Sequence, residues 1–470
     1  MAKDTEIRIK GEAAEAAPAH RRYAIIVSVL TCFVMPFMGN AMNLSVPQIG
    51  DEFGASASLV GWMITSYMLT VAALGVPMGK LADMTSRRNI LIAGAIVMTA
   101  GCVAAAFAVS MEMLIAMRCV QGAGAAMLTS TNLPLLISTY PPAMRGKALG
   151  IGLTAVYTGG ALGPVLGGIL NHNTGWRSIF IFVCIILAVA VVIAAVKLPA
   201  YRAEASNERF DCKGSIMFVV FITALVYGLS ECGSGLVPAA IGLLGIAAGV
   251  VFVWYELRTE DPVIDVRLFR SNIGYAMSNV SALMNYAATA GITYLISIYL
   301  QVVQGYSSQT AGIIMLAQPI IMATLTAKFG KLSDTHSPFK LSSLGMAVCA
   351  VGTSMFIFIG RDTGMLQVVA ALVITGLGFA MFSSPNTNAI LSCVDRKDYS
   401  AANAIVGTMR TVGQTSSMVL ITIVVSCLLP GLQLSEADPD QLIRVIKISF
   451  IIFTCICLTG IVFSLMRKKK

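Results

Sequence analysis

Residues 178–196 read SIFIFVCIILAVAVVIAAV, an apolar run without a single charged side chain. A helix that crosses the hydrocarbon core of a membrane needs about 20 predominantly apolar residues. Lipid offers no partner to backbone N–H and C=O groups, so a run of this length satisfies them as a helix. The stretch therefore predicts one membrane-spanning helix.

Strips without Asp, Glu, Lys or Arg recur along the whole chain. They cover residues 23–50, 53–79, 89–111, 119–144, 148–176, 178–196, 214–230, 232–255, 341–360, 363–394, 411–435 and 448–466. A longer block, 271–327, is interrupted near Gln304–Ser308 and predicts two helices. The sum is fourteen spans. The thirteenth is expected around residues 398–428, so it extends beyond the uncharged strip and contains Arg410. The ~10-residue alternating segments of an outer-membrane barrel are not seen.

The composition agrees with a membrane protein. Hydrophobic residues make up 57% of the 470 residues and charged residues 12%, whereas soluble domains average roughly 45–50% and about 25%. A soluble enzyme, a disordered chain, a collagen and a disulfide-stapled secreted domain are excluded. The cysteines show no paired spacing and the three histidines lie far apart. We therefore expect neither a metal nor a cofactor.

The basic residues predict the orientation. With a cytoplasmic N-terminus, 26 of the 32 lysines and arginines fall in cytoplasmic segments and four fall outside, as the positive-inside rule requires. The net charge of +9 is then explained by a cytoplasmic face that meets anionic lipid, without nucleic acid. No removable signal peptide is recognised. We expect a multi-pass protein of the cell membrane with both termini cytoplasmic.

An internal repeat predicts the architecture. Residues 122–132 read GAGAAMLTSTN and residues 376–386 read GLGFAMFSSPN, while GKLADMTSRR at 79–88 is similar to GKLSDTHSPFK at 330–340. Such a duplication is typical of two parallel six-helix bundles related by a pseudo-two-fold axis along the membrane normal. The predicted domains are a cytoplasmic tail (1–22), an N-terminal six-helix bundle (23–199), a linker with helices 7 and 8 (200–270), a C-terminal six-helix bundle (271–466) and a basic tail (467–470).

In their order and placement these motifs resemble the major facilitator superfamily, in its 14-helix drug:proton antiporter branch. The resemblance covers nearly the whole chain. It implies a gating motif after helix 2, with Gly79, Asp83, Arg87 and Arg88, whose weaker counterpart contains Asp334. The antiporter motif in helix 5 is similar at Gly159, Gly163, Pro164, Gly167 and Gly168. The family relates that motif to a seal against helix 11, although tight packing alone would also explain the glycines. For the motif at residues 79–88, the alternative to a gate is a simple cytoplasmic turn whose basic residues follow the positive-inside rule.

Two arginines inside the spans are the leading chemical candidates. Arginine near the bilayer centre costs at least ~2.5 kcal/mol, so Arg118 in helix 4 is expected to face the interior or a wet cavity rather than snorkel to the outer interface. Arg410 is either a cavity residue or a structural one. The family aspartate of helix 1 is replaced by Met38. The predicted substrate and coupling cavity comprises Arg118, Gln121, Asn43, Asn132, Tyr157, Asn285, Tyr286, Asn386, Arg410 and Gln414.

Two functions stay open. The first is a secondary active transporter that works by alternating access and exports small amphipathic compounds or drugs, driven by the proton gradient. The second is a proton symporter or facilitator for an organic anion or zwitterion, because Met38 removes a carboxylate and the two arginines would make the cavity positive. A membrane enzyme or channel has no supporting motif. The expected partners are a small-molecule substrate and membrane lipid, and the expected state is a monomer.

Overall fold

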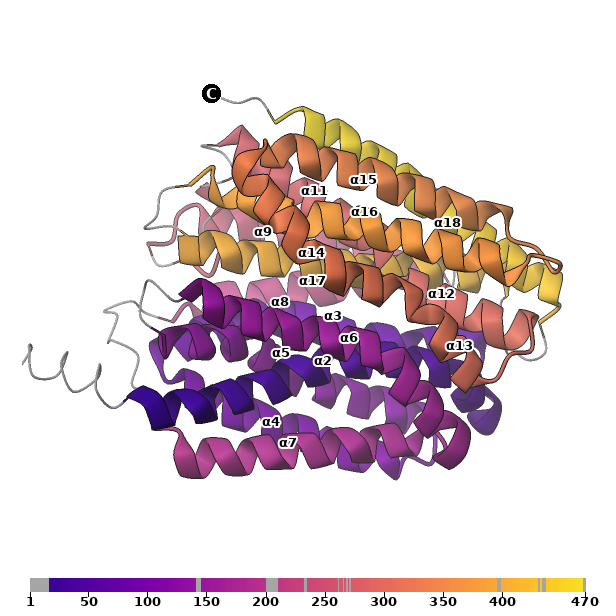
Figure 1. Cartoon of the computed structure of the whole chain (residues 1–470), viewed down its shortest axis with the longest axis horizontal. Helices are drawn as coiled ribbons and strands as arrows, with labels where there is room; N and C mark the ends of the chain where they lie inside the picture. The colour runs from indigo at the N-terminus through magenta and orange to yellow at the C-terminus, as the bar shows by residue number, and fades with distance from the viewer. Residues whose placement is uncertain are drawn as a thin grey trace, which may run out of the picture.

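The computed structural model describes residues 17–140, 145–199, 210–231, 235–260, 262–264, 266, 267, 269, 272–394, 399–429, 432 and 437–467. Every regular element in these residues is helical, which confirms the predicted all-α class (Figure 1). The first eight helices are α2 (Ala17–Phe53), α3 (Ala57–Met84), α4 (Arg87–Ala106), α5 (Met111–Ser138), α6 (Arg145–Thr174), α7 (Arg177–Lys197), α8 (Cys212–Ser230) and α9 (Leu236–Glu256). The others are α11 (Ile273–Thr289), α12 (Ile292–Ile298), the π-helix η2 (Tyr299–Val303), α13 (Ser308–Met315), α14 (Ala317–Thr335), α15 (Pro338–Met355), the 3-10 helix η3 (Phe356–Phe358), α16 (Met365–Leu391), α17 (Tyr399–Leu428) and α18 (Pro439–Leu465).

Twelve helical segments in the described chain are long and apolar enough to cross a membrane. The other two predicted spans, α5 and α6, have 28 and 30 residues but are not among the twelve. Both are rich in glycine and polar residues, and both pack against other helices on more than one side.

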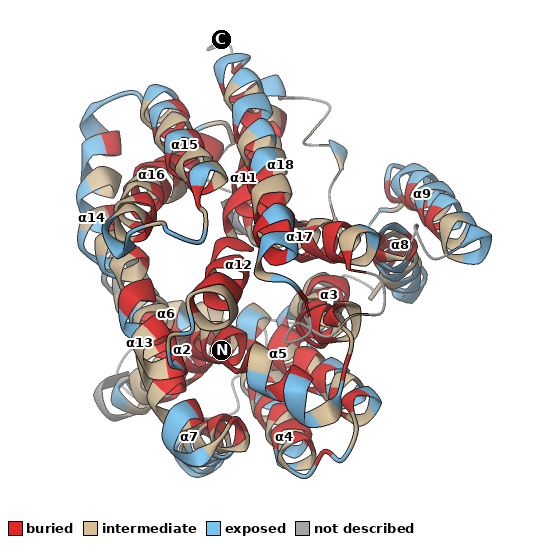
Figure 2. Ribbon diagram, turned by 90° about the vertical axis from the view of Figure 1, so that its right-hand side faces the viewer, coloured by how far each residue is buried: buried red, intermediate tan, exposed pale blue. Residues whose placement is uncertain are grey.

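The helices at the periphery show why the sequence suits lipid. Along α7 an apolar stripe is exposed, and a second apolar stripe on the opposite face is buried (Figure 2). The exposed stripe is Ile181, Ile185, Val189, Val192 and Val196, and the buried one is Phe180, Val183, Leu187, Ala190 and Ala194. A helix that is hydrophobic all round belongs in a membrane, with one side against protein and the other against acyl chains.

The helices form two groups with a hairpin at their side. Helices α2–α7 pack together as the N-terminal group, and the elements from α11 to α18 pack together as the C-terminal group (Figure 1). Helices α8 and α9 pair closely, because Gly228 and Gly242 let their backbones touch, and α8 contacts both α3 and α17 (Figure 2). We call the end where α2 begins and α3 ends the inner end, after the predicted orientation, and the opposite one the outer end.

Close glycine contacts recur in both groups. The motif glycine Gly79 faces Ser130, whose Cβ would lie 3.6 Å from a methyl group added at the glycine, and its counterpart Gly330 likewise faces Ser384. In the N-terminal group Gly124 lies against Gly94 and Met98, and in the C-terminal group Gly378 lies against Gly345 and Cys349. The repeat in the sequence thus corresponds to equivalent helix crossings, and at the Gly124 and Gly378 crossings a side chain larger than hydrogen does not fit.

The predicted interruption near residues 304–308 is confirmed, because η2 ends at Val303 and α13 begins at Ser308. The Ser307 hydroxyl caps α13 by accepting a hydrogen bond from the Thr310 N–H at 3.2 Å. A second interruption, at Ala290 and Gly291, separates α11 from α12 and was not predicted. There the Gly291 N–H donates to the Ser417 hydroxyl of α17 at 2.9 Å.

Candidate functional site

Arg118 lies in a closed polar pocket between α3, α4 and α5. Its Nε donates to the carbonyl oxygen of Met63 at 3.1 Å, and a terminal nitrogen donates to Gln121 Oε1 at 2.9 Å. Its guanidinium lies over the Tyr67 ring, 4.2 Å from the centroid. Only 1% of Arg118 is exposed. The residue therefore faces the protein interior, as predicted, and does not snorkel.

Gln121 extends the pocket to the next helix. Its Nε2 donates to the carbonyl oxygen of Gly101 in α4 at 3.1 Å. The Arg118 charge is thus stabilised by a backbone carbonyl, an amide and an aromatic face. In this conformation the guanidinium is covered on every side, so it is not accessible to a substrate.

A second polar cluster lies between the two helix groups, around Tyr157 of α6. The side chains of Thr326 in α14 and Ser383 in α16 lie near the Tyr157 hydroxyl, as do Tyr286 of α11 and Arg410 of α17. Tyr157 is about 18 Å along a helix of about 45 Å, close to its middle. One N-terminal and four C-terminal helices therefore contribute to one polar site at mid-depth, which we call the central cluster.

The central cluster combines an aromatic surface with one positive charge. Tyr286 packs edge-on against Phe379, with 5.4 Å between the ring centroids. Arg410 is half-buried. The groups that act on Tyr157 include this cation and no carboxylate. Met38, at the family's aspartate position, is fully buried among apolar side chains. The cluster is suited to a ligand with an aromatic part and a neutral or negative polar group.

The remaining cavity candidates lie apart from the central cluster or make bonds within one helix group. Asn132 Oδ1 accepts from the Leu133 N–H at 2.7 Å, and Asn285 Nδ2 contacts Cys349 Sγ at 3.7 Å. Asn43 is buried at the outer half of α2, with its Oδ1 lacking a hydrogen-bond partner. Gln414 is half-buried, one helical turn after Arg410.

Asn386 binds the end of the chain. Its Oδ1 accepts a hydrogen bond from Arg467 at 2.8 Å, and its Nδ2 donates to the Ser278 carbonyl oxygen at 3.2 Å. Arg467 also donates to the Ser342 hydroxyl at 2.9 Å. Burial lowers the pKa of Arg467 to about 10, so it keeps its charge at neutral pH. Asn386 thus holds the first residue of the basic tail against the C-terminal group.

The gating motif lies at the inner end and makes its bonds within the N-terminal group. Arg87 forms an ion pair with Asp83 at 2.8 Å, and the two side chains are 35% and 54% exposed. Arg88 donates to the carbonyl oxygens of Ala194 and Ala195 at the end of α7. In the described part of the chain, no hydrogen bond or ion pair joins Asp83, Arg87 or Arg88 to the C-terminal group. The side chain of Asp334 lies outside the described part.

The antiporter motif brings α6 against two partners. A methyl group at Gly159 would overlap the Phe33 carbonyl oxygen, and methyl groups at Gly163 and Gly167 would crowd the same face of α2. On another face, Gly168 touches the backbone of Ser308, and the carbonyl oxygen of Pro164 touches Gly312. The expected seal against helix 11 was wrong: α6 meets α13 in helix 10, because small residues on both sides permit contact there.

Hydrogen bonds between the two groups concentrate in the outer half. Ser297 donates to the Asn43 carbonyl oxygen at 2.7 Å, and the Ser58 and Ser426 hydroxyls are 3.2 Å apart. Four more such bonds join Thr65 to Thr422, Thr415 to Met68, Ser308 to Gly168 and Ala57 to Leu432. In the described chain the outer ends are therefore held together, and the inner ends are the freer ones.

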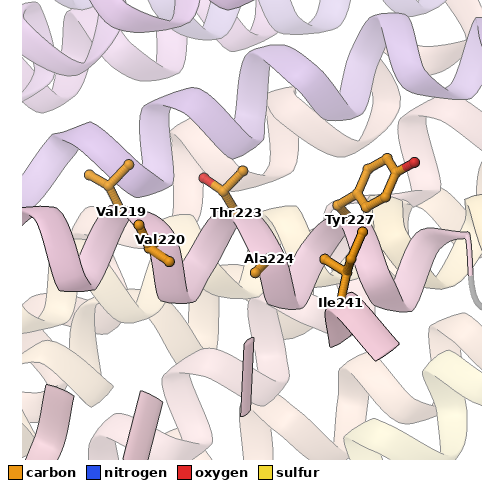
Figure 3. A pocket seen from close by; sticks show the side chains of 6 residues that line it. All are labelled: Val219, Val220, Thr223, Ala224, Tyr227 and Ile241. Atoms are coloured by element: carbon orange, nitrogen blue, oxygen red, sulfur yellow. The ribbon is translucent and has the colours of Figure 1, made fainter. Parts of the chain in front are cut away.

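Two lateral grooves lie away from the central cluster. One of about 700 Å³ lies between α2, α6 and α7 and is lined mainly by apolar residues such as Phe33 and Phe182. The other, of about 380 Å³, is lined by the α8 side chains Val219, Val220, Thr223, Ala224 and Tyr227 together with Ile241 of α9 (Figure 3). Their composition suits acyl chains. Within the described residues, no group of three His, Cys, Asp or Glu side chains could hold a metal ion.

Sequence reasoning missed several members of both polar sites. Tyr67, Thr326 and Ser383 were not singled out, because a lone Tyr, Thr or Ser in an apolar helix looks the same whether it faces lipid or a polar site. One signal was available for Ser383, since it lies inside the repeated segment 376–386. No comparable signal marks Thr326.

Comparison with known proteins identifies the family. The model of the Major Facilitator Superfamily matches residues 28–415 and 278–470. Riboflavin transporter RibZ of Clostridioides difficile (strain 630) is 29% identical over 391 residues, covering 82% of this chain and 84% of the relative. Multidrug resistance protein Stp of Mycobacterium tuberculosis (strain ATCC 25618 / H37Rv) is 29% identical over 430 residues, covering 89% and 79%.

Solved structures agree in fold. A peptide transporter POT in complex with sulfate superposes with a TM-score of 0.71 at 15% identity, covering 97% of this chain and 98% of that one. A bacterial homologue of the human lysosomal transporter Spinster, in an inward-facing and unoccupied conformation, gives 0.70 at 14% identity, covering 96% and 97%. At these identities the likeness shows the fold alone. Because the family model spans most of the sequence, the chain belongs to the Major Facilitator Superfamily, a family of membrane transporters.

Proposed function

We propose that this protein is a secondary active transporter that exports small amphipathic compounds by alternating access, coupled to protons, and that it belongs to the 14-helix drug:proton antiporter branch. The central cluster carries this proposal, because Tyr157 from one helix group and Arg410 from the other act on the same mid-depth site. A substrate bound there would contact both groups and would be released when they separate.

The distribution of bonds supports the movement that the proposal needs. We take the two groups as six-helix bundles, with α8 and α9 as a linker that contacts both. Hydrogen bonds join the two groups at the outer end, whereas the gating motif makes none to the described part of the C-terminal group. This distribution fits an inward-facing state. In the opposite state, Asp83 and Arg87 would exchange their mutual ion pair for partners on the C-terminal bundle, while the outer bonds would break.

The names of two relatives are compatible with a small-molecule substrate that has aromatic parts. One is named for riboflavin and another for multidrug resistance, and Tyr157, Tyr286 and Phe379 offer matching ring surfaces. For this chain, export of such compounds is our proposal. We further propose a monomer in the cell membrane with both termini cytoplasmic, without cofactor or nucleic acid.

The alternative is transport of an organic anion or zwitterion, by symport or facilitated diffusion. A specific observation favours it: Arg410 is the one charge among the groups that act on Tyr157, and Met38 provides no carboxylate to balance it. Arg118 adds nothing to this charge in the present conformation, because it is occluded.

Inverted membrane vesicles separate the two functions. Energised vesicles are given ethidium as a cationic probe, riboflavin as a neutral one and fluorescein as an anionic one, with and without a protonophore. Loss of probe accumulation on addition of the protonophore supports proton-coupled export. Probe accumulation that is unchanged by the protonophore refutes the coupling. Arg410→Gln should reduce anion transport about tenfold, the effect of losing one charged hydrogen bond, whereas Arg410→Lys keeps the charge as the matched control. Equal loss of all three probes in Arg410→Gln alone would refute the anion alternative.

A further inference from the structure

Two carboxylates face each other at the inner end of the linker hairpin. Asp211 precedes α8 and caps it, because its Oδ1 accepts a hydrogen bond from the Gly214 N–H at 2.8 Å. Glu256 is the last residue of α9 and is 1% exposed. Neither residue was singled out in the sequence, where 45 positions separate them.

The facing oxygens of this pair lack hydrogen-bond partners. Asp211 Oδ2 and Glu256 Oε1 are both buried and both unsatisfied. A methyl group added at Gly214 would overlap both oxygens, so they lie within about 5 Å of each other, the range in which two carboxylates share a site. The hydrogen of Gly214 leaves the gap between them open.

The hydrogen bonds located in the described chain go to the other oxygen of each carboxylate, and the Val263 N–H also lies near Glu256. The Tyr255 hydroxyl donates to Asp211 Oδ1 at 3.0 Å, and the Ile264 N–H donates to Glu256 Oε2 at 3.1 Å. Lys80, which follows Gly79 of the gating motif at the inner end of α3, is close enough to attract the Glu256 carboxylate electrostatically. Two buried like charges without a donor between them are strongly unfavourable, whereas a proton bound to one carboxylate would remove the repulsion between them.

We propose that Asp211 and Glu256 together bind one proton, and that its release strengthens the attraction of the linker for Lys80 at the inner end of α3. The proton resides on Glu256 Oε1, which then donates a hydrogen bond to Asp211 Oδ2. When it leaves to water, the pair changes from one negative charge to two, opposite one lysine. The site would give the proposed proton coupling a carboxylate that helix 1 does not supply, and to that extent it rests on the proposed function.

The variants are chosen to keep the fold. In Glu256→Gln the amide NH₂ can donate to Asp211 Oδ2, and its oxygen can still accept from Ile264, so the variant imitates the protonated pair. Asp211→Asn is a second variant, because asparagine retains a cap for α8. Glu260→Gln is the matched control: Glu260 is exposed four residues further along. All are accepted only if they elute as the wild type does in gel filtration.

The first readout is independent of transport. Infrared difference spectra of the full chain in nanodiscs, between about pH 5 and about pH 8, should contain the C=O stretch of a carboxylic acid. We expect this band in the wild type and in Glu260→Gln, and its loss in Glu256→Gln and in Asp211→Asn. An unchanged band in both pair variants would overturn the proposal.

The second readout is export of the probe dye from proteoliposomes across the same pH range. One titrating proton changes the rate by up to about tenfold per pH unit; Glu256→Gln should flatten this dependence, while Glu260→Gln keeps it. If wild-type export is independent of the proton gradient but the carboxylic acid band is lost in the two pair variants, the proton site is supported and the proposed coupling is refuted. If wild-type export is coupled and Glu256→Gln keeps both band and pH dependence, the coupling stands and the site is refuted.

Discussion

Gly312 allows α13 to touch α6, and we expect Gly312→Ala to shift the protein away from the outer-closed state. A methyl group at this position would overlap the carbonyl oxygen of Pro164. To restore an ordinary contact the two helices must move apart by about 1 Å, and small-to-large changes in a packed contact typically cost about 1–3 kcal/mol. The gain of up to about 1 kcal/mol in helix propensity applies to both conformations and cancels. The equilibrium should therefore shift by about 5–150-fold.

Pulsed electron paramagnetic resonance measures this shift. Spin labels at Val109 in the N-terminal group and Leu366 in the C-terminal group, both more than 80% exposed at the outer end, report its opening. Gly312→Ala should move the distance distribution toward longer values. Gly160→Ala is the control, because its methyl group would meet only ordinary contacts at 3.8 Å or more within the N-terminal group. An unchanged distribution in folded Gly312→Ala would refute the reasoning.

Three further substitutions test individual contacts. Gly159→Ala should lower stability by about 1–3 kcal/mol in thermal unfolding, since the methyl group overlaps a backbone carbonyl of α2, while Gly160→Ala should not; equal stability of the two would contradict the packing described. Arg118→Lys cannot reproduce the forked donors and the ring contact and should lose about 1.5–3 kcal/mol, so an unaltered melting temperature would argue against the pocket. Trp62→Phe removes the 2.6 Å hydrogen bond to Glu231, costs about 1 kcal/mol and should speed hydrogen exchange in α8; unchanged exchange would show that this bond does not fasten the linker.

The sequence predicted those features that depend on local patterns. Apolar runs such as 178–196 identified the helices, because lipid leaves the backbone no alternative. The interruption at 304–308 was visible as a cluster of polar residues and a glycine. The repeat in 122–132 and 376–386 anticipated equivalent crossings, because glycine contacts require the same spacing wherever the same helices meet.

Features that depend on which helix faces which could not be predicted. Asn386 and Tyr157 are both polar residues in apolar helices, yet the first binds Arg467 and the second belongs to the central cluster. Arg118 was recognised from the cost of an intramembrane charge, but its cover by Tyr67 arises only when α3 packs on α5. The pairing of Asp211 with Glu256 likewise depends on the α8–α9 hairpin.

Alternating access through the space between the two groups is the central claim, and locking the outer end tests it most directly. The Ser58 and Ser426 hydroxyls are 3.2 Å apart across the group boundary, so cysteines at both positions should oxidise to a disulfide with little rearrangement. The measurement is dye export in proteoliposomes by S58C/S426C, with the neighbouring Cys427 replaced by serine, before and after reduction. We predict that the oxidised protein is inactive and that reduction restores export. Export that continues at the same rate with the disulfide formed would contradict the account.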